Sequence, residues 1–207
     1  PMAETQFSYE FLATQLQRSL DSMGTGYMMR TSDFIKVGGF SLYKNMIFGD
    51  WELWFKLTDI GYKVTSIEQC FTYREHDSIS TLTSAFDYQK ELFKYLHCIK
   101  SKALNNKKLQ IIIDRHTLEY LHFFCKGLIY RELLNKKNKT QVSTIVINFQ
   151  DFLVEFLPKQ KFNLSNDIYI KFYSILDKII IGRFCFKFFI YFKFKFKLVL
   201  LYLSNSK

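Results

Sequence analysis

Residues 47–57, IFGDWELWFKL, place two carboxylates, Asp50 and Glu52, beside Trp51 and Trp54, which are the only tryptophans in the chain. From Asp50 onward the large apolar side chains recur at the spacing of an amphipathic helix. An aspartate at the start of a helix most often serves as its N-cap, so the residue type alone does not indicate catalysis.

The segments on both sides of this helix are short and rich in turn-forming residues. Six of the eight glycines lie within the first 61 residues, which predicts tight turns and close backbone contacts there. From the periodicity we expect helices over residues 8–24 and 50–61, a helical turn over 31–40, a short strand over 25–30, and one or two strands over 62–75.

Beyond residue 82 the sequence changes to long helical patterns and a basic composition. We expect helices over residues 85–104, 109–134 and 143–157, the last ended by Pro158. Residues 1–81 contain 7 Lys/Arg and 10 Asp/Glu, whereas residues 82–207 contain 22 and 9. We therefore place a boundary near residue 82 and expect the second part to face an anionic partner.

Residues 179–203, IIIGRFCFKFFIYFKFKFKLVLLYL, are apolar and aromatic but contain five cations. At the centre of a membrane span each Lys or Arg costs about 2.5–3.5 kcal/mol, which disfavours spanning. Two interpretations stay open. The segment lies in the interface of an anionic membrane with its lysines reaching the headgroups, or it docks on another part of the protein.

The four cysteines form no C-x-x-C pair, and the chain opens without a basic and apolar signal segment. These features predict reduced thiols in a cytoplasmic protein. Nucleic acid is not an expected partner, because the lysines are scattered over the helices and no recognised binding motif is present.

Five short motifs follow one another in the first part of the chain. They are GTGYMMR (24–30), DFIKVGGF (33–40), FGDWELWFKL (48–57), GYKV (61–64) and YREHDSIS (73–80). In this order and spacing they resemble the family 2 glycosyltransferases, which are inverting enzymes with a GT-A fold. The resemblance covers about residues 8–82.

The resemblance implies an α/β fold. Residues 1–82 would form the C-terminal part of a Rossmann-like GT-A catalytic domain, and residues 83–207 a mainly α-helical, basic extension that ends in the tail at 179–203. The family's donor-binding half carries an Asp-x-Asp motif, which is absent from this sequence. We therefore expect little or no transfer by these residues alone, and a fragment of a longer enzyme.

The same resemblance makes Asp50 the general base that deprotonates the acceptor hydroxyl. Gly49, where relatives often have a glutamate, is expected to turn the backbone that presents it. Trp51 and Glu52 would lie beside the acceptor sugar.

Other matched residues concern the donor. Gly24, Thr25 and Gly26 would let the backbone approach the sugar or the acceptor. Arg74 could reach a phosphate, and His76 matches a family ligand of the divalent metal, Mn²⁺ or Mg²⁺.

The function implied is that of a hexosyltransferase in bacterial surface polysaccharide synthesis. It would move a sugar from a nucleotide-sugar donor, first of all a UDP-sugar, to a glycan or lipid-linked acceptor at the inner face of the cell membrane. The alternative is a catalytically inactive, membrane-associated remnant or scaffold.

Overall fold

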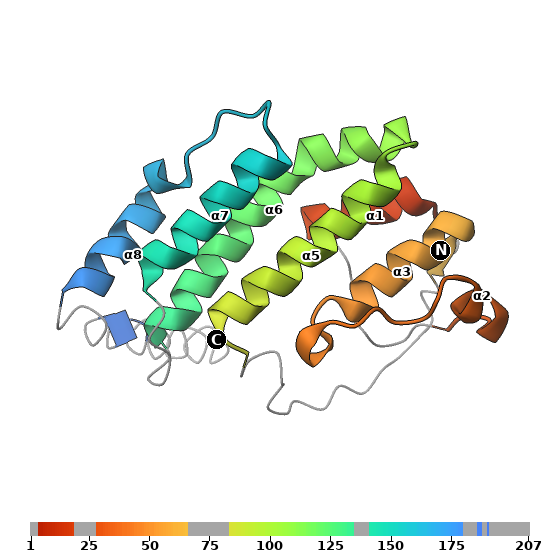
Figure 1. The fold of residues 1–207 in the computed structure, drawn as a ribbon, viewed down its shortest axis with the longest axis horizontal. Helices are drawn as coiled ribbons and strands as arrows, with labels where there is room; N and C mark the ends of the chain where they lie inside the picture. Colours follow the sequence, from red (N-terminus) through yellow and green to blue (C-terminus); the bar gives the residue numbers. More distant parts are fainter. Residues whose placement is uncertain are drawn as a thin grey trace, which may run out of the picture. The chain divides into compact units, whose positions relative to one another are not determined.

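The computed structural model describes residues 4–18, 28–65, 83–134 and 141–179, together with Phe186, Lys187 and Ile190. The chain divides into two compact units, residues 1–122 and 123–207, each with buried apolar side chains of its own. The boundary expected near residue 82 falls inside the first unit. Along the chain the elements are β1 (Glu4–Gln6), α1 (Ser8–Gln17), α2 (Thr31–Lys36), the 3₁₀ helix η1 (Lys44–Met46), α3 (Gly49–Ile60), β2 (Lys63–Thr65), α5 (Ala85–Ala103), α6 (Lys107–Leu134), α7 (Val142–Phe156), the 3₁₀ helix η2 (Leu164–Asn166) and α8 (Ile168–Lys178) (Figure 1).

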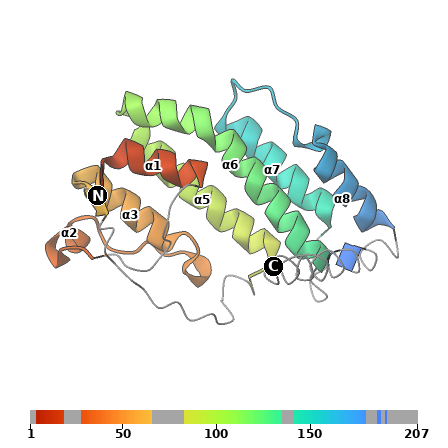
Figure 2. The ribbon, with the colours of Figure 1, turned by 180° about the vertical axis from the view of Figure 1, so that it is seen from behind.

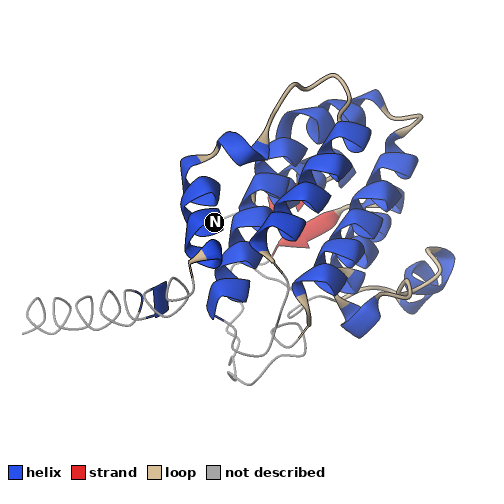
Figure 3. Ribbon diagram, turned by 60° about the vertical axis from the view of Figure 1, so that its left-hand side comes forward, coloured by secondary structure: helices blue, strands red, loops and turns tan. Residues whose placement is uncertain are grey.

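The predicted α/β fold with a Rossmann-like half is wrong for the part of the chain that the structure describes. The sheet found there consists of β1 and β2, which pair antiparallel with Thr5 opposite Val64, and helices make up most of the remainder (Figure 3). A Rossmann-like half needs several parallel strands joined by crossover helices. Two strands of three residues each cannot form such a layer.

The individual helices follow the sequence pattern more closely than the fold class does. The helices predicted over residues 85–104, 109–134 and 143–157 are confirmed as α5, α6 and α7. α3 confirms the helix predicted over residues 50–61, and α7 ends at Phe156, two residues before Pro158, as the restricted backbone next to a proline favours.

The extended segments were predicted less well. Residues 28–30, the described part of the strand expected over 25–30, have no regular structure. Of the strands expected over 62–75, β2 is confirmed, and residues 66–75 lie outside the described part.

The helix predicted over residues 8–24 is shorter in the structure. α1 ends at Gln17, where Arg18 takes up a left-handed conformation with φ 60°.

The core of the first unit lies between its helices. α1 packs against α3, and α3 packs against α5, which lies beside it when the unit is seen from either side (Figures 1 and 2). Fully buried apolar side chains from each helix fill the space between them, which removes their apolar surface from water. They include Phe11, Leu12, Leu16, Leu53, Phe55, Leu92, Tyr95, Leu96 and Ile99.

Gln15 is a buried amide that ties these three helices together. Its side chain is 0% exposed. Its Nε2 donates to the backbone carbonyl of Trp51 on α3 at 3.2 Å, and its Oε1 accepts from the Tyr95 hydroxyl on α5 at 2.7 Å. Both ends of a buried polar side chain are therefore satisfied within the core.

Replacing Gln15 by leucine should lower the free energy of unfolding by about 1–3 kcal/mol, because the buried hydroxyl of Tyr95 loses its acceptor. Urea unfolding followed by circular dichroism measures the change. The matched control is Gln17→Leu, since Gln17 lies on the same helix and is exposed. A loss no larger for Gln15→Leu than for Gln17→Leu would contradict this role.

The second unit places η2 and α8 against α7. Asp177 on α8 caps α7, because its Oδ2 accepts from the backbone N–H of Val142 at 2.9 Å. Gln150 on α7 holds the segment before α8, accepting from the N–H of Leu164 and donating to the carbonyl of Phe162. Within the described ranges, no helix has the length and apolar composition needed to cross a bilayer.

Candidate functional site

The backbone that leads into α3 is left-handed at three non-glycine residues. Asn45, Met46 and Phe48 have φ values of 55°, 56° and 63°. This region costs a non-glycine residue on the order of 1–3 kcal/mol and is found preferentially at functional sites. Phe48 is the N-cap residue of α3, and its side chain makes no capping hydrogen bond. The entry to α3 is therefore the first candidate for a site.

Aromatic packing holds Phe48 in this conformation. Its ring is 5% exposed and stacks on Tyr95 with centroids 5.5 Å apart, and it meets Tyr88 and Trp51 edge-on at 5.3 and 5.8 Å. The expectation that Gly49 turns the backbone is wrong, because positive φ among the described glycines occurs at Gly38 and Gly39. Phe48 makes the turn instead.

Asp50 lies in the first turn of α3, two residues after the N-cap. It is therefore not itself the cap of this helix. Its carboxylate is partly exposed, and Oδ1 accepts from the N–H of Trp51 at 2.9 Å. Burial raises the pKa of Asp50, although hydrogen bonds from the backbone N–H groups of Trp51 and Asp50 lower it. The ion pairs between described residues include none to Asp50.

Trp51 joins the aromatic cluster on α3, α5 and α6. Its half-buried ring lies 6.3 Å from the rings of Tyr95 and Tyr120, in addition to its contact with Phe48. Part of the indole is still accessible, so contact with an acceptor sugar stays a prediction. Ring contacts with Phe48, Tyr95 and Tyr120 hold the indole of Trp51 next to Asp50.

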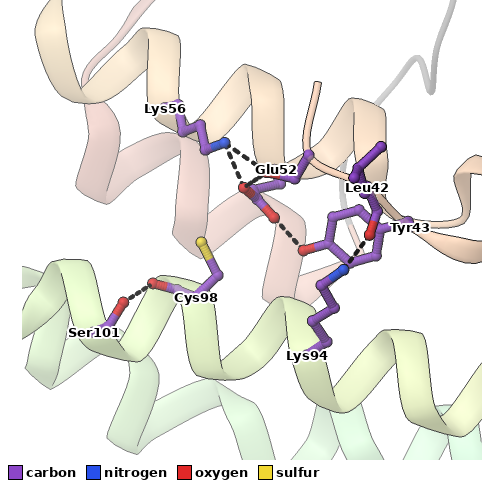
Figure 4. A network of polar contacts seen from close by, with 8 residues as sticks. Leu42, Tyr43, Glu52, Lys56, Lys94, Cys98 and Ser101 are labelled. Carbon is purple, nitrogen blue, oxygen red and sulfur yellow. Dashed lines mark hydrogen bonds and ion pairs between the residues drawn. The ribbon is translucent and has the colours of Figure 1, made fainter. Parts of the chain in front are cut away.

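Glu52 lies on the interior side of α3, with its side chain 4% exposed. Lys56 Nζ is 2.6 Å from Glu52 Oε1 and donates to Ser41 Oγ at 2.7 Å. The hydroxyl of Tyr43 donates to Oε2 of the carboxylate (Figure 4), and the hydroxyl of Ser41 donates to Oε1. Both oxygens of Glu52 are thus engaged within the protein. The predicted contact between Glu52 and an acceptor would require this network to open.

These contacts determine the charge states of the network. Although burial raises the pKa of Glu52, the hydrogen bonds from Lys56, Ser41 and Tyr43 outweigh it and lower that pKa. Burial and the nearby carboxylate raise the pKa of Tyr43, so that its hydroxyl stays a donor. Burial also raises the pKa of the Cys98 thiol, which lies near Glu52, to about 11 (Figure 4).

Asp50 and Glu52, which share one turn of α3, therefore have opposite environments. Asp50 is partly desolvated without a cation among the described residues, whereas Glu52 is paired and fully hydrogen-bonded. Desolvation without a cation raises the pKa of a carboxylate, whereas pairing and hydrogen bonds lower it.

Replacing each acid by its amide should separate these roles. Because the pKa of Glu52 is lowered, its contribution to stability is present above its ordinary pKa of 4.5 and is lost as the pH falls through the folded value. Because the pKa of Asp50 is raised, its contribution is present at low pH and is lost as the pH rises through the folded value. At neutral pH we expect Glu52→Gln to lose about 3–5 kcal/mol, because the ammonium of Lys56, 13% exposed, is left without its carboxylate. We expect Asp50→Asn to lose nothing or to gain stability, because the pKa of Asp50 is raised.

Urea unfolding at several pH values from acidic to neutral tests the direction of the pH dependence that we expect for each acid. Glu52→Gln should flatten the fall in stability on the acidic side, whereas Asp50→Asn should leave that fall in place. Equal losses for the two variants at neutral pH would show that the acids do not differ in this way.

Of the predicted site residues, the structure brings Asp50, Trp51 and Glu52 together at the start of α3. Gly24, Thr25, Gly26, Arg74 and His76 lie outside the described residues. Within the described part of the chain, no three His, Cys, Asp or Glu side chains gather as metal ligands do. The predicted divalent metal at His76 stays a prediction.

The sequence prediction missed the residues that hold this turn in place. Lys56 could have been found, since it follows Glu52 at the i,i+4 spacing of a helical ion pair. Ser41 and Tyr43 precede α3 in an irregular segment, and Gln15 reaches it from α1. No periodic pattern indicates contacts of this kind.

No protein-family model, curated protein or solved structure matches the chain. The resemblance to the family 2 glycosyltransferases stays a prediction, carried by the order of the five motifs.

Proposed function

We propose that this chain carries the acceptor side of an inverting glycosyltransferase, with Asp50 as the general base. The observation that carries the proposal is the state of Asp50 itself. It is a partly exposed, partly desolvated carboxylate at the start of a helix, on a backbone held in place by a buried aromatic cluster. The proposal concerns the chemistry of this residue and does not require the α/β fold.

In the proposed reaction, Asp50 accepts the proton of an acceptor hydroxyl as that oxygen attacks the anomeric carbon of the donor sugar. The bond from the anomeric carbon to the diphosphate oxygen breaks on the opposite face, and the electron pair leaves with the nucleoside diphosphate. Desolvation makes a carboxylate a stronger base, and the helix around Asp50 fixes its position. Trp51 would contact the acceptor through the exposed part of its ring.

The donor is proposed to be a nucleotide sugar, with UDP-sugars as the first candidates, and the acceptor a glycan or a lipid-linked glycan. A divalent metal held in part by His76 would neutralise charge on the departing diphosphate. Arg74 and the backbone at Gly24, Thr25 and Gly26 are proposed to lie on the donor side.

The test is acceptor-dependent release of UDP. The protein expressed from its complete reading frame is incubated with Mn²⁺, a glycolipid extract of the cells that make it, and UDP-glucose, UDP-galactose or UDP-N-acetylglucosamine. We expect release with at least one donor, and labelled sugar in the lipid fraction. The 207 residues alone should release little or none, because they contain no Asp-x-Asp motif. No transfer by the complete protein with any donor would contradict the proposal.

A further inference from the structure

α8 and the residue that follows it expose four large apolar side chains. They form what we call the α8 stripe: Ile168, Phe172, Ile175 and Ile179, which are 74%, 53%, 57% and 50% exposed. The spacing of four and three residues puts Ile168, Phe172 and Ile175 along one line of the helix. Ile179 follows as the C-cap residue, where the backbone is extended. The opposite face carries Ile170, which is 1% exposed. The helix therefore has an apolar face on each side, and the described residues of this unit cover only the face of Ile170.

The basic and acidic residues of α8 also differ in their surroundings. Lys171 and Lys178 are exposed and lie along one edge of the α8 stripe. The two acidic residues accept hydrogen bonds from backbone N–H groups of the protein. Asp167 caps α8 by accepting from the N–H groups of Tyr169 and Ile170, and Asp177 caps α7. The outer face of the helix is thus apolar and cationic, without a free acid.

The charge of the whole unit matches that of its helix. Residues 123–207 contain 15 Lys/Arg and 5 Asp/Glu, whereas residues 1–122 contain 14 of each. The second unit thus accounts for the entire formal net charge of +10. The strong net positive charge of the unit that also exposes an apolar stripe restricts the partners that can cover this stripe.

We propose that the α8 stripe is an interfacial binding site for an anionic phospholipid bilayer. The stripe would enter the boundary between headgroups and acyl chains, while Lys171 and Lys178 extend to the lipid phosphates. α8 has 11 residues, which is too short to cross a bilayer at 1.5 Å per residue and suits a helix lying in the plane of the surface. A second copy of the chain would cover the stripe only by bringing two strongly basic units together.

The test compares two pairs of variants of the full chain. Phe172→Ser with Ile175→Ser removes the centre of the α8 stripe, and both positions are exposed, so the core is left intact. Ile147→Ser with Val154→Ser is the matched control on α7, where the side chains are 56% and 58% exposed. The readout is co-sedimentation with vesicles of phosphatidylcholine and phosphatidylglycerol, with phosphatidylcholine vesicles as reference.

We expect the original chain to bind the anionic vesicles and to lose binding as salt is added. The α8 pair should lower the partition coefficient by at least about tenfold, because two apolar side chains no longer enter the interface. The α7 pair should change it by less than about twofold, as expected of side chains outside the interface. Matching circular dichroism spectra would show that both pairs keep the fold.

Equal vesicle binding by the original chain and the α8 pair would overturn the proposal. So would a dimer in sedimentation velocity that the α8 pair converts to monomer, because a second copy would then cover the stripe. The inference rests on α8 and the charge of its unit, and it holds or fails independently of sugar transfer at Asp50.

Discussion

Replacing Lys56 by methionine is expected to destabilise the protein by about 3–5 kcal/mol, because it leaves the buried carboxylate of Glu52 without its cation. The side chains of Lys56 and Glu52 are 13% and 4% exposed, so water cannot take the place of the lysine. Ser41 and Tyr43 would still donate hydrogen bonds to the carboxylate, but they carry no compensating charge. Such a loss is a large fraction of the stability of a typical domain.

The matched control is Lys44→Met. Lys44 also forms an ion pair, 2.8 Å from Asp87, but its side chain is 56% exposed. An exposed pair of this kind contributes about 0–1 kcal/mol. Urea unfolding at neutral pH should therefore separate the two variants clearly. A loss for Lys56→Met as small as that for Lys44→Met would show that Glu52 does not depend on its partner.

A double variant extends this test if Lys56→Met unfolds. Replacing both Glu52 and Lys56 by methionine removes the uncompensated charge together with its partner, and such apolar replacements of buried pairs are often tolerated. We expect the double variant to be more stable than Lys56→Met alone, even though Ser41 and Tyr43 lose an acceptor. The opposite order would mean that the lysine stabilises the fold by packing and not by charge.

The individual helices were largely predictable from the sequence, whereas the fold was not. The helical spacing from Asp50 to Gly61 and the long periodic segments after residue 82 correctly predicted α3, α5 and α6. Periodicity reports which face of one element is buried, and it says little about how elements pair. The α/β prediction came from the motif resemblance, and within the described residues three-residue strands replace the predicted Rossmann-like layer.

The candidate site was also predictable from the sequence only in part. The sequence indicated that Asp50, Trp51 and Glu52 share one turn, but not that Glu52 faces the interior while Asp50 stays accessible. That difference depends on Ser41 and Tyr43, which lie in an irregular segment before the helix. Side chains from such segments follow no spacing rule, so their contacts become visible only in three dimensions.

Asp50→Asn is expected to lower the rate of sugar transfer by about 10²–10⁴-fold, the usual contribution of a general base. The amide keeps the shape of the side chain and its acceptor for the Trp51 N–H, but it cannot take up the hydroxyl proton. Donor binding should be unchanged, because Asp50 is proposed to act on the acceptor. Stability should not fall, because the partly buried carboxylate has a raised pKa.

The measurement that tests the central claim is the initial rate of acceptor-dependent UDP release, compared for the complete protein, Asp50→Asn and Asp59→Asn. Asp59 is the matched control, since it is an exposed acid on the same helix. The account predicts a loss of at least about a hundredfold for Asp50→Asn and a near-normal rate for Asp59→Asn. Transfer by Asp50→Asn at the rate of the Asp59→Asn control would contradict the assignment of Asp50 as the base.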